Sequence, residues 1–363
     1  MKRIGNSFKG ILAGIILVIG GIVLLWWNEG NNVRNLKTTA EMEKTYVDVK
    51  SDVIDPANED KLIATYGKVG NEEELTDSTF AVTVKTPLLR RVVEVYQWVE
   101  ESETDEDGDT RYTYKKEWST DIINSGDFHQ SGHDNPAQKL YSDAEYASSK
   151  VTLGAFTLSS NQVYDMSTEG IYTDFNTETL TGLGLTVSGN YVTNSKDLTN
   201  PAVGDVRISF VYNNTTDLSV LAVQKGDSFV DFVSSAGKRI NRLWDGIHSG
   251  EEIINQIKAE NKLIKWLLRL AGTVLCIAGF AAILKPISAI TSYIPILGSI
   301  VGAAVGLVAL VLGLCVSLLI IAVAWLRYRP LLGIGLIAVV VVLIVLLSMR
   351  KKNKVETPAP VQQ

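Results

Sequence analysis

One stretch of the chain carries the side-chain types that hold a metal ion in hydrolases. Asp127, His129, His133 and Asp134 stand in "DFHQSGHDNP", and imidazole and carboxylate groups are common zinc ligands. A His-x3-His pair converges on one ion when it lies on a helix, which the intervening Ser-Gly disfavours. Turn formation accounts for the same side chains without a metal. These four residues are therefore metal candidates only, and we expect no cofactor.

A second acidic stretch imitates the start of a calcium loop. Asp105, Asp107 and Asp109 form a D-x-D-G-D pattern. Thr110 stands where a calcium loop requires Gly, and Lys116 stands where it requires a bidentate Glu. The Asp-Gly dipeptide instead favours a tight turn between two strands. We interpret the stretch as the tip of a β-hairpin.

The sequence on either side of this tip has opposite charges. Acidic residues precede the turn and basic residues follow it, and opposite charges across a ladder help to fix strand register. We therefore predict a charge-paired hairpin over residues 92–123, which offers a candidate interaction surface made of Glu100, Glu103, Asp105, Asp107, Asp109, Arg111, Lys115 and Lys116.

No established catalytic motif accompanies these clusters. The sequence has no nucleophile elbow, phosphate loop or dinucleotide fingerprint. Residues 28–262 contain 39 of the 40 acidic side chains against 22 of the 34 basic ones. Such a region has no surplus of positive charge for phosphates, so nucleic acid is not an expected partner. Both cysteines, Cys276 and Cys315, lie in apolar runs outside it.

The elements that position these clusters are mostly strands. Short β-branched or aromatic runs bounded by Gly, Asp and Asn predict strands at 61–69, 79–86, 92–100, 112–119, 149–159, 205–213 and 218–226. Helical spacing is found at 135–147 and 251–270, and the second helix is expected to continue into an apolar run. The fold class predicted for residues 28–262 is an α+β domain rich in antiparallel strands.

Four apolar stretches flank this domain and are long enough to cross a bilayer. We predict a cytoplasmic N-terminus (1–10), four transmembrane helices and a basic cytoplasmic tail (350–363); the helices are expected at 11–27, 263–285, 294–326 and 331–349. Basic residues gather before the first span and after the fourth, which places both ends in the cytoplasm by the positive-inside rule. Arg327 and Arg329 fall on the opposite side and run against that rule.

Glycines recur at helical spacing in the third span. Gly298, Gly302 and Gly306 are four residues apart, and Gly313 falls on much the same side. Such a strip lets helix backbones approach closely, either between subunits or within the chain. Gly10 and Gly14 repeat the spacing in the first span. The strip is thus a candidate for helix packing or oligomerisation.

Several of these segments together resemble a known family. "VEVYQWVEE", "GHDNP", "VGDVRISF", "VQKGDSF" and "WLRYRPLL" occur in the order found in the LUMA family (transmembrane protein 43), and the chain is expected to be a bacterial member. The resemblance implies four spans and a large lumenal domain, with no established catalytic residues. Animal members are associated with the endoplasmic reticulum and inner nuclear membrane, where they self-associate and organise the envelope alongside lamins and emerin.

These observations lead to one preferred function and two alternatives. We predict a non-enzymatic membrane scaffold that self-associates and organises the membrane through its extracytoplasmic domain. Its expected partners are the lipid bilayer, further copies of itself and an unidentified protein. The expected location is a bacterial inner membrane with a periplasmic domain, or the endoplasmic reticulum or inner nuclear membrane in a eukaryote. The alternatives are an oligomeric ion channel or conductance regulator and, more remotely, a metal-dependent hydrolase.

Overall fold

The chain folds into two compact units. The computed structural model describes residues 2–104, 109–291, 295–328 and 330 of the 363-residue chain. The membrane unit comprises Met1–Ala40, Ser235–Gly237 and Asn255–Gln363. The β unit comprises Glu41–Ser234 and Lys238–Ile254.

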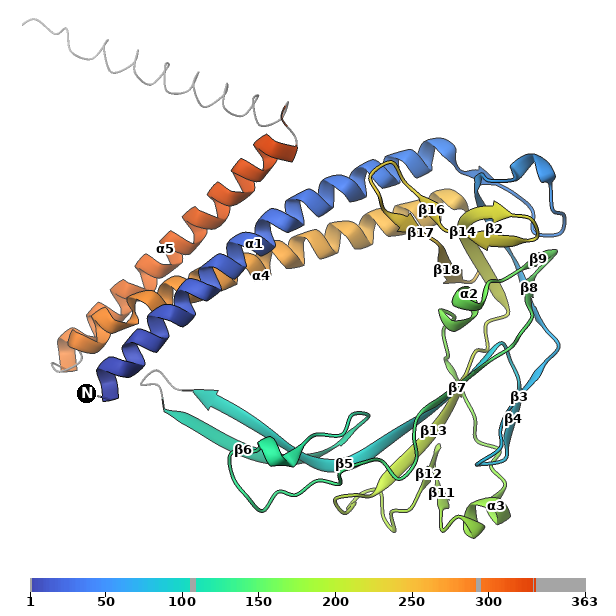
Figure 1. Cartoon of the computed structure of the whole chain (residues 1–363), viewed down its shortest axis with the longest axis horizontal. Helices are drawn as coiled ribbons and strands as arrows, with labels where there is room; N and C mark the ends of the chain where they lie inside the picture. The colour runs from blue at the N-terminus through green and yellow to red at the C-terminus, as the bar shows by residue number, and fades with distance from the viewer. Residues whose placement is uncertain (1, 105–108, 292–294, 329, 331–363) are drawn as a thin grey trace, which may run out of the picture. The chain divides into compact units, whose positions relative to one another are not determined.

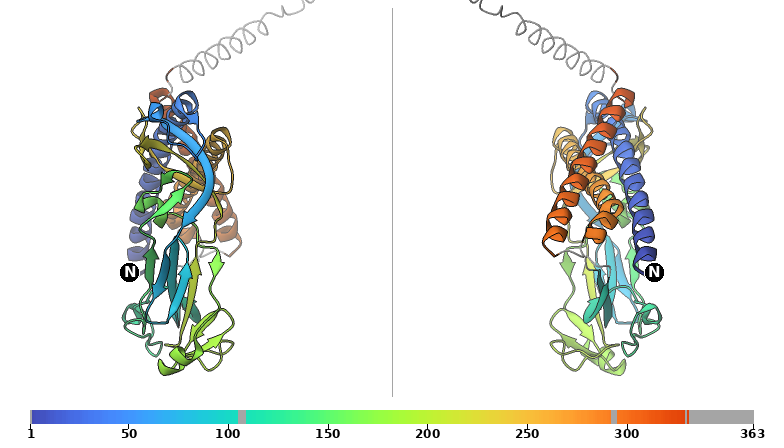
Figure 2. Two further views of the ribbon diagram at one scale, coloured as in Figure 1. Left: turned by 90° about the vertical axis from the view of Figure 1, so that its right-hand side faces the viewer. Right: turned by 90° about the vertical axis from the view of Figure 1, so that its left-hand side faces the viewer.

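Three long helices provide the apolar segments of the molecule: α1 (Lys2–Thr45), α4 (Gly250–Thr291) and α5 (Pro295–Tyr328). Each contains a stretch long and apolar enough to cross a membrane, at Gly10–Thr45, Gly250–Ile287 and Val301–Tyr328. They lie side by side within the membrane unit (Figure 2). The first three predicted spans thus fall on helices, while the fourth, 331–349, lies outside the described residues.

All three of these helices are longer than one crossing requires. A helix of about 20 residues spans the hydrocarbon core, whereas α1 has 44 residues, α4 has 42 and α5 has 34. The predicted helix at 251–270 is confirmed, including its continuation into the second apolar run. Pro286, where that run was expected to end, lies inside α4 and the helix continues to Thr291.

One sheet of the β unit is built around the long strand β14 (Figure 1). Its main order is β15-β14-β2-β8-β9, with β1 added to β2 and β18 added to β14. β1 pairs with β2 in parallel, and the other pairings described for this sheet are antiparallel. The bounds are β1 (Val47–Asp48), β2 (Leu62–Asn71), β8 (Val151–Leu153), β9 (Phe156–Thr157), β14 (Asp217–Lys225), β15 (Ser228–Val230) and β18 (Arg242–Asp245).

A second, antiparallel sheet holds the predicted hairpin. Its order is β11-β12-β13-β5-β6, with β10 on β13 and β7 on β5. The bounds are β5 (Leu88–Thr104), β6 (Thr110–Ser119), β7 (Ala144–Ala147), β10 (Gly170–Ile171), β11 (Thr186–Ser188), β12 (Tyr191–Thr193) and β13 (Val206–Tyr212). Separate two-stranded pairs are β3 (Glu74–Asp77) with β4 (Val82–Lys85), and β16 (Phe232–Val233) with β17 (Arg239–Ile240). The short helices are α2 (Ser160–Tyr164) and α3 (Thr177–Gly182), with 3-10 turns at Pro56–Asn58 and Ser125–Asp127.

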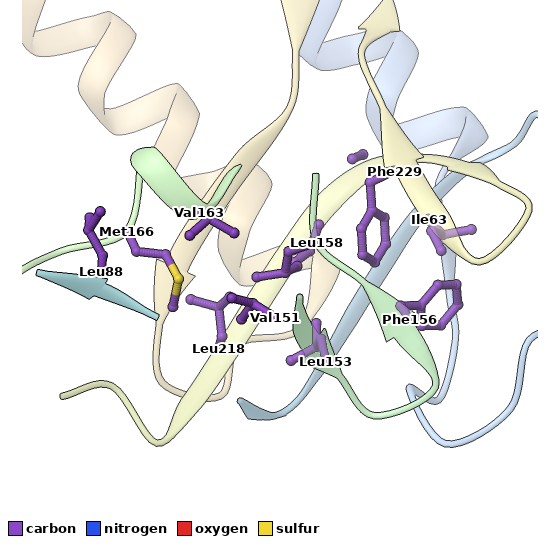
Figure 3. Packing of buried hydrophobic residues seen from close by; sticks show 12 residues of the cluster. Ile63, Leu88, Val151, Leu153, Phe156, Leu158, Val163, Met166, Leu218 and Phe229 are labelled. Atoms are coloured by element: carbon purple, nitrogen blue, oxygen red, sulfur yellow. The ribbon is translucent and has the colours of Figure 1, made fainter. Parts of the chain in front are cut away.

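Each sheet is associated with its own buried core. Figure 3 shows the first core, in which Phe156 stacks on Phe229 with ring centroids 5.0 Å apart. Every second residue of β13 from Val206 to Phe210 is buried, as expected for a half-buried strand, and Ile208 and Phe210 belong to the second core. Burying each such large side chain contributes about 1.5–3 kcal/mol. The expected α+β domain, rich in antiparallel strands, is therefore present.

The helix predicted at 135–147 is absent, and a strand stands in its place. Ala144–Ala147 form β7 and pair with residues 88–91 of β5. Just before β7, the Asp143 carboxylate accepts a hydrogen bond of 2.7 Å from the Val93 backbone N–H. The helical spacing of this segment was a local preference, and pairing with an existing strand outweighed it.

Candidate functional site

A buried ion pair joins α1 and α4 in the membrane unit. Arg269 Nε on α4 donates to the Glu29 carboxylate on α1 at 2.7 Å, and the exposed fractions of the two side chains are 13% and 1%. Glu29 follows directly on the apolar run of α1, while Arg269 lies inside the apolar run of α4. A buried charge is costly unless it is paired, so each residue requires the other.

The third helix binds the same carboxylate. Trp325 on α5 donates its indole N–H to the second oxygen of Glu29 at 2.9 Å. The Arg269 guanidinium also lies over the rings of Trp266 and Trp325, 4.8 and 5.8 Å from their centroids. Such cation–π contacts further compensate a desolvated cation. Glu29, Arg269 and Trp325, named here the Glu29 node, therefore tie three helices together.

Between this node and the N-terminal end of α1, small residues let α1 and α4 approach each other closely. A Cβ added to Gly14 would lie 2.6 Å from the carbonyl oxygen of Gly279, and one added to Gly21 would lie 2.8 Å from that of Gly272. Real Cβ atoms do not come so close, so a larger residue at either position would force the helices apart. Gly14 and Gly21 therefore serve packing within the chain, whereas a Cβ added to Gly10 would lie 4.0 Å from the Ala282 carbonyl oxygen and would not clash.

The predicted glycine strip of the third span divides into two parts. A Cβ on Gly313 would lie 2.5 Å from Ile277 of α4, so this position is packed within the chain. At Gly302 and Gly306 nothing within the described part of the structure lies within 4 Å of an added Cβ. Gly298 lies on α5, but its side-chain surroundings are outside the described residues. Among the described residues, Gly302 and Gly306 thus form an open small-residue face.

The predicted hairpin in the β unit is formed by β5 and β6. Ten residue pairs run from Val95↔Ser119 to Thr104↔Thr110. Glu103 stands opposite Arg111, and Lys115 reaches diagonally to Glu101 at 2.6 Å. Asp105 and Asp107 at the tip lie outside the described residues, whereas Asp109 lies just before β6.

Two other predicted charges of the hairpin have different partners. Glu100 stands opposite Tyr114 and accepts a hydrogen bond from its hydroxyl group. Lys116 lies over the Trp98 ring, 4.6 Å from the centroid. The expected register is therefore supported by both ion pairs and aromatic contacts.

The two candidate histidines stack on this hairpin. His129 lies parallel to Tyr112 with ring centroids 4.0 Å apart, and His133 lies parallel to Tyr114 at 3.7 Å. The His133 ring also packs perpendicular to the Trp98 ring, with the ring centroids 4.7 Å apart. In the described parts of the chain, no three His, Cys, Asp or Glu side chains converge as a metal-holding group. The structure thus uses both imidazoles as packing groups.

The loop that carries the histidines is fastened to β5 by the Asn135 side chain and is bonded internally through Asp127. Asn135 accepts from the Trp98 N–H at 2.7 Å and donates to the Trp98 carbonyl at 2.9 Å, as a neighbouring strand would. The Asp127 carboxylate accepts from the Asn124 amide at 3.0 Å, within a 3-10 turn. Asp134 belongs to the same loop, between His133 and Asn135. The "GHDNP" motif therefore holds a loop against the hairpin.

The hydrogen bond to Glu100 has an electrostatic consequence. Donation from the Tyr114 hydroxyl lowers the pKa of Glu100 below its usual 4.5, although burial opposes this, and the His129 backbone N–H helps to lower it. The pKa of Tyr114 is raised by burial and by its bond to Glu100. Both shifts favour the arrangement in which the tyrosine donates to a charged carboxylate.

The comparisons with known proteins agree with this architecture. A sequence model described as "Transmembrane protein 43" matches residues 95–330. The chain belongs to the transmembrane protein 43 family. The human "Transmembrane protein 43" is 28% identical over 355 residues, covering 91% of this chain and 87% of the human one. The fruit fly "Transmembrane protein 43 homolog" is 26% identical over 339 residues, 89% of each chain.

Membership of the transmembrane protein 43 family confirms the resemblance seen in the sequence, and no solved structure matches the chain. The orangutan relative is 28% identical over 370 residues, covering 94% of this chain and 91% of its own. Together with the three apolar helices, the family match identifies an integral membrane protein. A bacterial origin stays a prediction.

The Glu29 node is the feature that the sequence analysis missed. One signal for it was available, because Arg269 lies inside a predicted span and an intramembrane charge calls for a partner. That signal does not identify the partner. Glu29 is 240 residues away in the chain, and only the packing of α1 on α4 brings the two together.

Proposed function

We propose that this integral membrane protein acts as a non-catalytic scaffold that self-associates through α5. The observation that supports the proposal is the open face at Gly302 and Gly306. Other small residues of the bundle, such as Gly14, Gly21 and Gly313, have a helix packed against them. A small-residue face that has no neighbour in the described part of the chain is suited to receive the helix of a second copy.

The decisive experiment is the mass of the intact protein in lipid nanodiscs. A defined multimer is expected for the unaltered chain, and the Gly302→Leu/Gly306→Leu variant should shift it to monomer because the leucines hold the helix backbones apart. Ala304→Leu is the matched control, since Ala304 is exposed and lies about 200° around the helix from Gly302. A monomer for the unaltered chain, or a multimer that survives the double substitution, would refute the proposal.

The β unit is proposed to supply the scaffold's contact with a partner protein. In support, the β5–β6 hairpin presents charged side chains to solvent, and Glu101 and Lys115 are each about half exposed. The charge distribution of the sequence supports placing this unit on the extracytoplasmic side. We propose a bacterial inner membrane with the β unit in the periplasm, and the endoplasmic reticulum or inner nuclear membrane if the organism is a eukaryote.

A further inference from the structure

A hollow of about 820 Å³ lies within the membrane unit, between the polar end of the apolar run in α1 and the C-terminal end of α5. The two helices are in contact there. A Cβ added to Gly30 of α1 would lie 2.8 Å from the Tyr328 ring, and the Trp26 and Tyr328 ring centroids are 5.7 Å apart.

The lining of the hollow changes from apolar to cationic along one face of α1. Val23, Trp27, Gly30, Arg34 and Lys37 follow one another at steps of four, three, four and three residues, which places them on one side of the helix. From the first to the last, the helix rises by about 21 Å. One end therefore lies in the apolar run, and the other end presents two cations.

A third cation enters the hollow from α5. Arg327 lines it together with Arg34 and Lys37, and none of the described lining residues is acidic. All three side chains are exposed, and none of them forms an ion pair with another described residue. These three cations repel one another, since the described lining supplies no counter-charge. An anion that accepts hydrogen bonds from several of them is therefore favoured in the hollow. A phosphate group fits this requirement, since Arg and Lys both bind phosphate oxygens.

We propose that this hollow binds the phosphate of an anionic phospholipid, with the acyl chains directed along Val23 and Trp27 towards the apolar run of α1. A soluble phosphate compound would not use the apolar end. Tryptophan side chains such as Trp26 and Trp27 are suited to the level of lipid headgroups. Binding of a phosphate also explains the position of Arg327, which opposes the positive-inside rule in the predicted topology. This lipid-binding proposal does not depend on self-association of the protein.

The test is native mass spectrometry of the full chain from micelles holding equal amounts of phosphatidylglycerol and phosphatidylcholine. The unaltered protein should retain phosphatidylglycerol preferentially. The Arg34→Gln/Lys37→Gln/Arg327→Gln variant should lose that preference by at least about tenfold, because each cation near an anionic lipid contributes roughly a fivefold factor. If the triple variant fails to fold, Arg34→Gln alone should lower the preference by about fivefold.

A charge-matched control separates the hollow from general electrostatics. Lys50, Lys196 and Lys262 are exposed cations that do not line the hollow, so their triple replacement by Gln should leave the preference intact. Equal retention of the two lipids by the unaltered protein would overturn the proposal, as would a preference that survives in the variant of the hollow. Displacement of the lipid by millimolar glycerol 3-phosphate would overturn the lipid assignment and indicate a soluble phosphate ligand.

Discussion

At the scale of single residues, the buried charges of the Glu29 node should contribute to the free energy of unfolding. Replacing Glu29 with Gln leaves Arg269 buried without its counter-ion, and breaking a buried pair in this way costs about 3–5 kcal/mol. We therefore expect Glu29→Gln to lower the free energy of unfolding by that amount, measured by denaturant titration in mixed micelles. Arg269→Met should cost a similar amount.

The double variant distinguishes an ion pair from two independent contributions. Glu29→Gln/Arg269→Met removes both charges, so it should cost clearly less than the sum of the single variants. Lys262→Gln, an exposed change on the same helix as Arg269, should stay within about 0.5 kcal/mol. Strict additivity of the two single effects would contradict the pairing.

At the scale of elements, the hairpin should respond to pH through Glu100. A carboxylate whose pKa is lowered by folding stabilises the folded state above its unfolded pKa, and this contribution is lost as the pH falls through the folded pKa. Glu100→Gln should therefore lower the melting temperature at pH 7, and the difference from the unaltered protein should shrink as the pH falls below about 4.5. Thermal unfolding of the full chain, followed by near-ultraviolet circular dichroism at each pH, measures the melting temperature and its pH dependence.

Two further variants test whether the pH dependence of the melting temperature comes from the hydrogen bond between Tyr114 and Glu100. Glu169→Gln removes an exposed carboxylate outside the hairpin and should not reproduce the pH dependence. Tyr114→Phe removes the donor while keeping the ring that stacks on His133, and it should reproduce the dependence. A difference between Glu100→Gln and the unaltered protein that stays constant from pH 7 to pH 3 would show that the hydrogen bond does not govern it.

At the scale of the whole molecule, the proposed topology can be tested by chemical labelling. In a chain whose Cys276 and Cys315 are replaced by Ser, Lys196→Cys tests the β unit and Lys351→Cys tests the basic tail. A membrane-impermeant maleimide should label the Lys196→Cys variant in spheroplasts, and the Lys351→Cys variant only after lysis. The physical reason is that basic flanks are retained in the cytoplasm.

The cysteine-free chain without either new thiol serves as the background for this experiment. Labelling of the Lys351→Cys variant in intact spheroplasts, with protection of the Lys196→Cys variant, would invert the topology. Labelling of both would imply an odd number of crossings. The first result would remove the placement of the β unit outside the cytoplasm, whereas the second would keep that placement and move the basic tail to the same side.

Local pattern was sufficient for most elements of the fold. The apolar runs predicted three of the long helices, and alternation along segments such as Val206–Tyr212 predicted strands, because burial on one side repeats every two residues in a strand. The helix predicted at 135–147 failed since its neighbour β5 offered pairing, which no local pattern contains. The two histidines that were metal candidates stack on Tyr112 and Tyr114, and these contacts with distant residues are likewise absent from any local pattern.

The sequence by itself determined the family, the apolar helices and the strand-rich domain, because these depend on composition, periodicity and ordered motifs along the chain. The tertiary structure alone decided which helices meet. It paired Glu29 with Arg269, packed Gly313 against Ile277 and left Gly302 and Gly306 open on the described surface of α5. The physical reason is that these contacts join residues far apart in the chain, so helix packing, rather than any local preference, selects the partners.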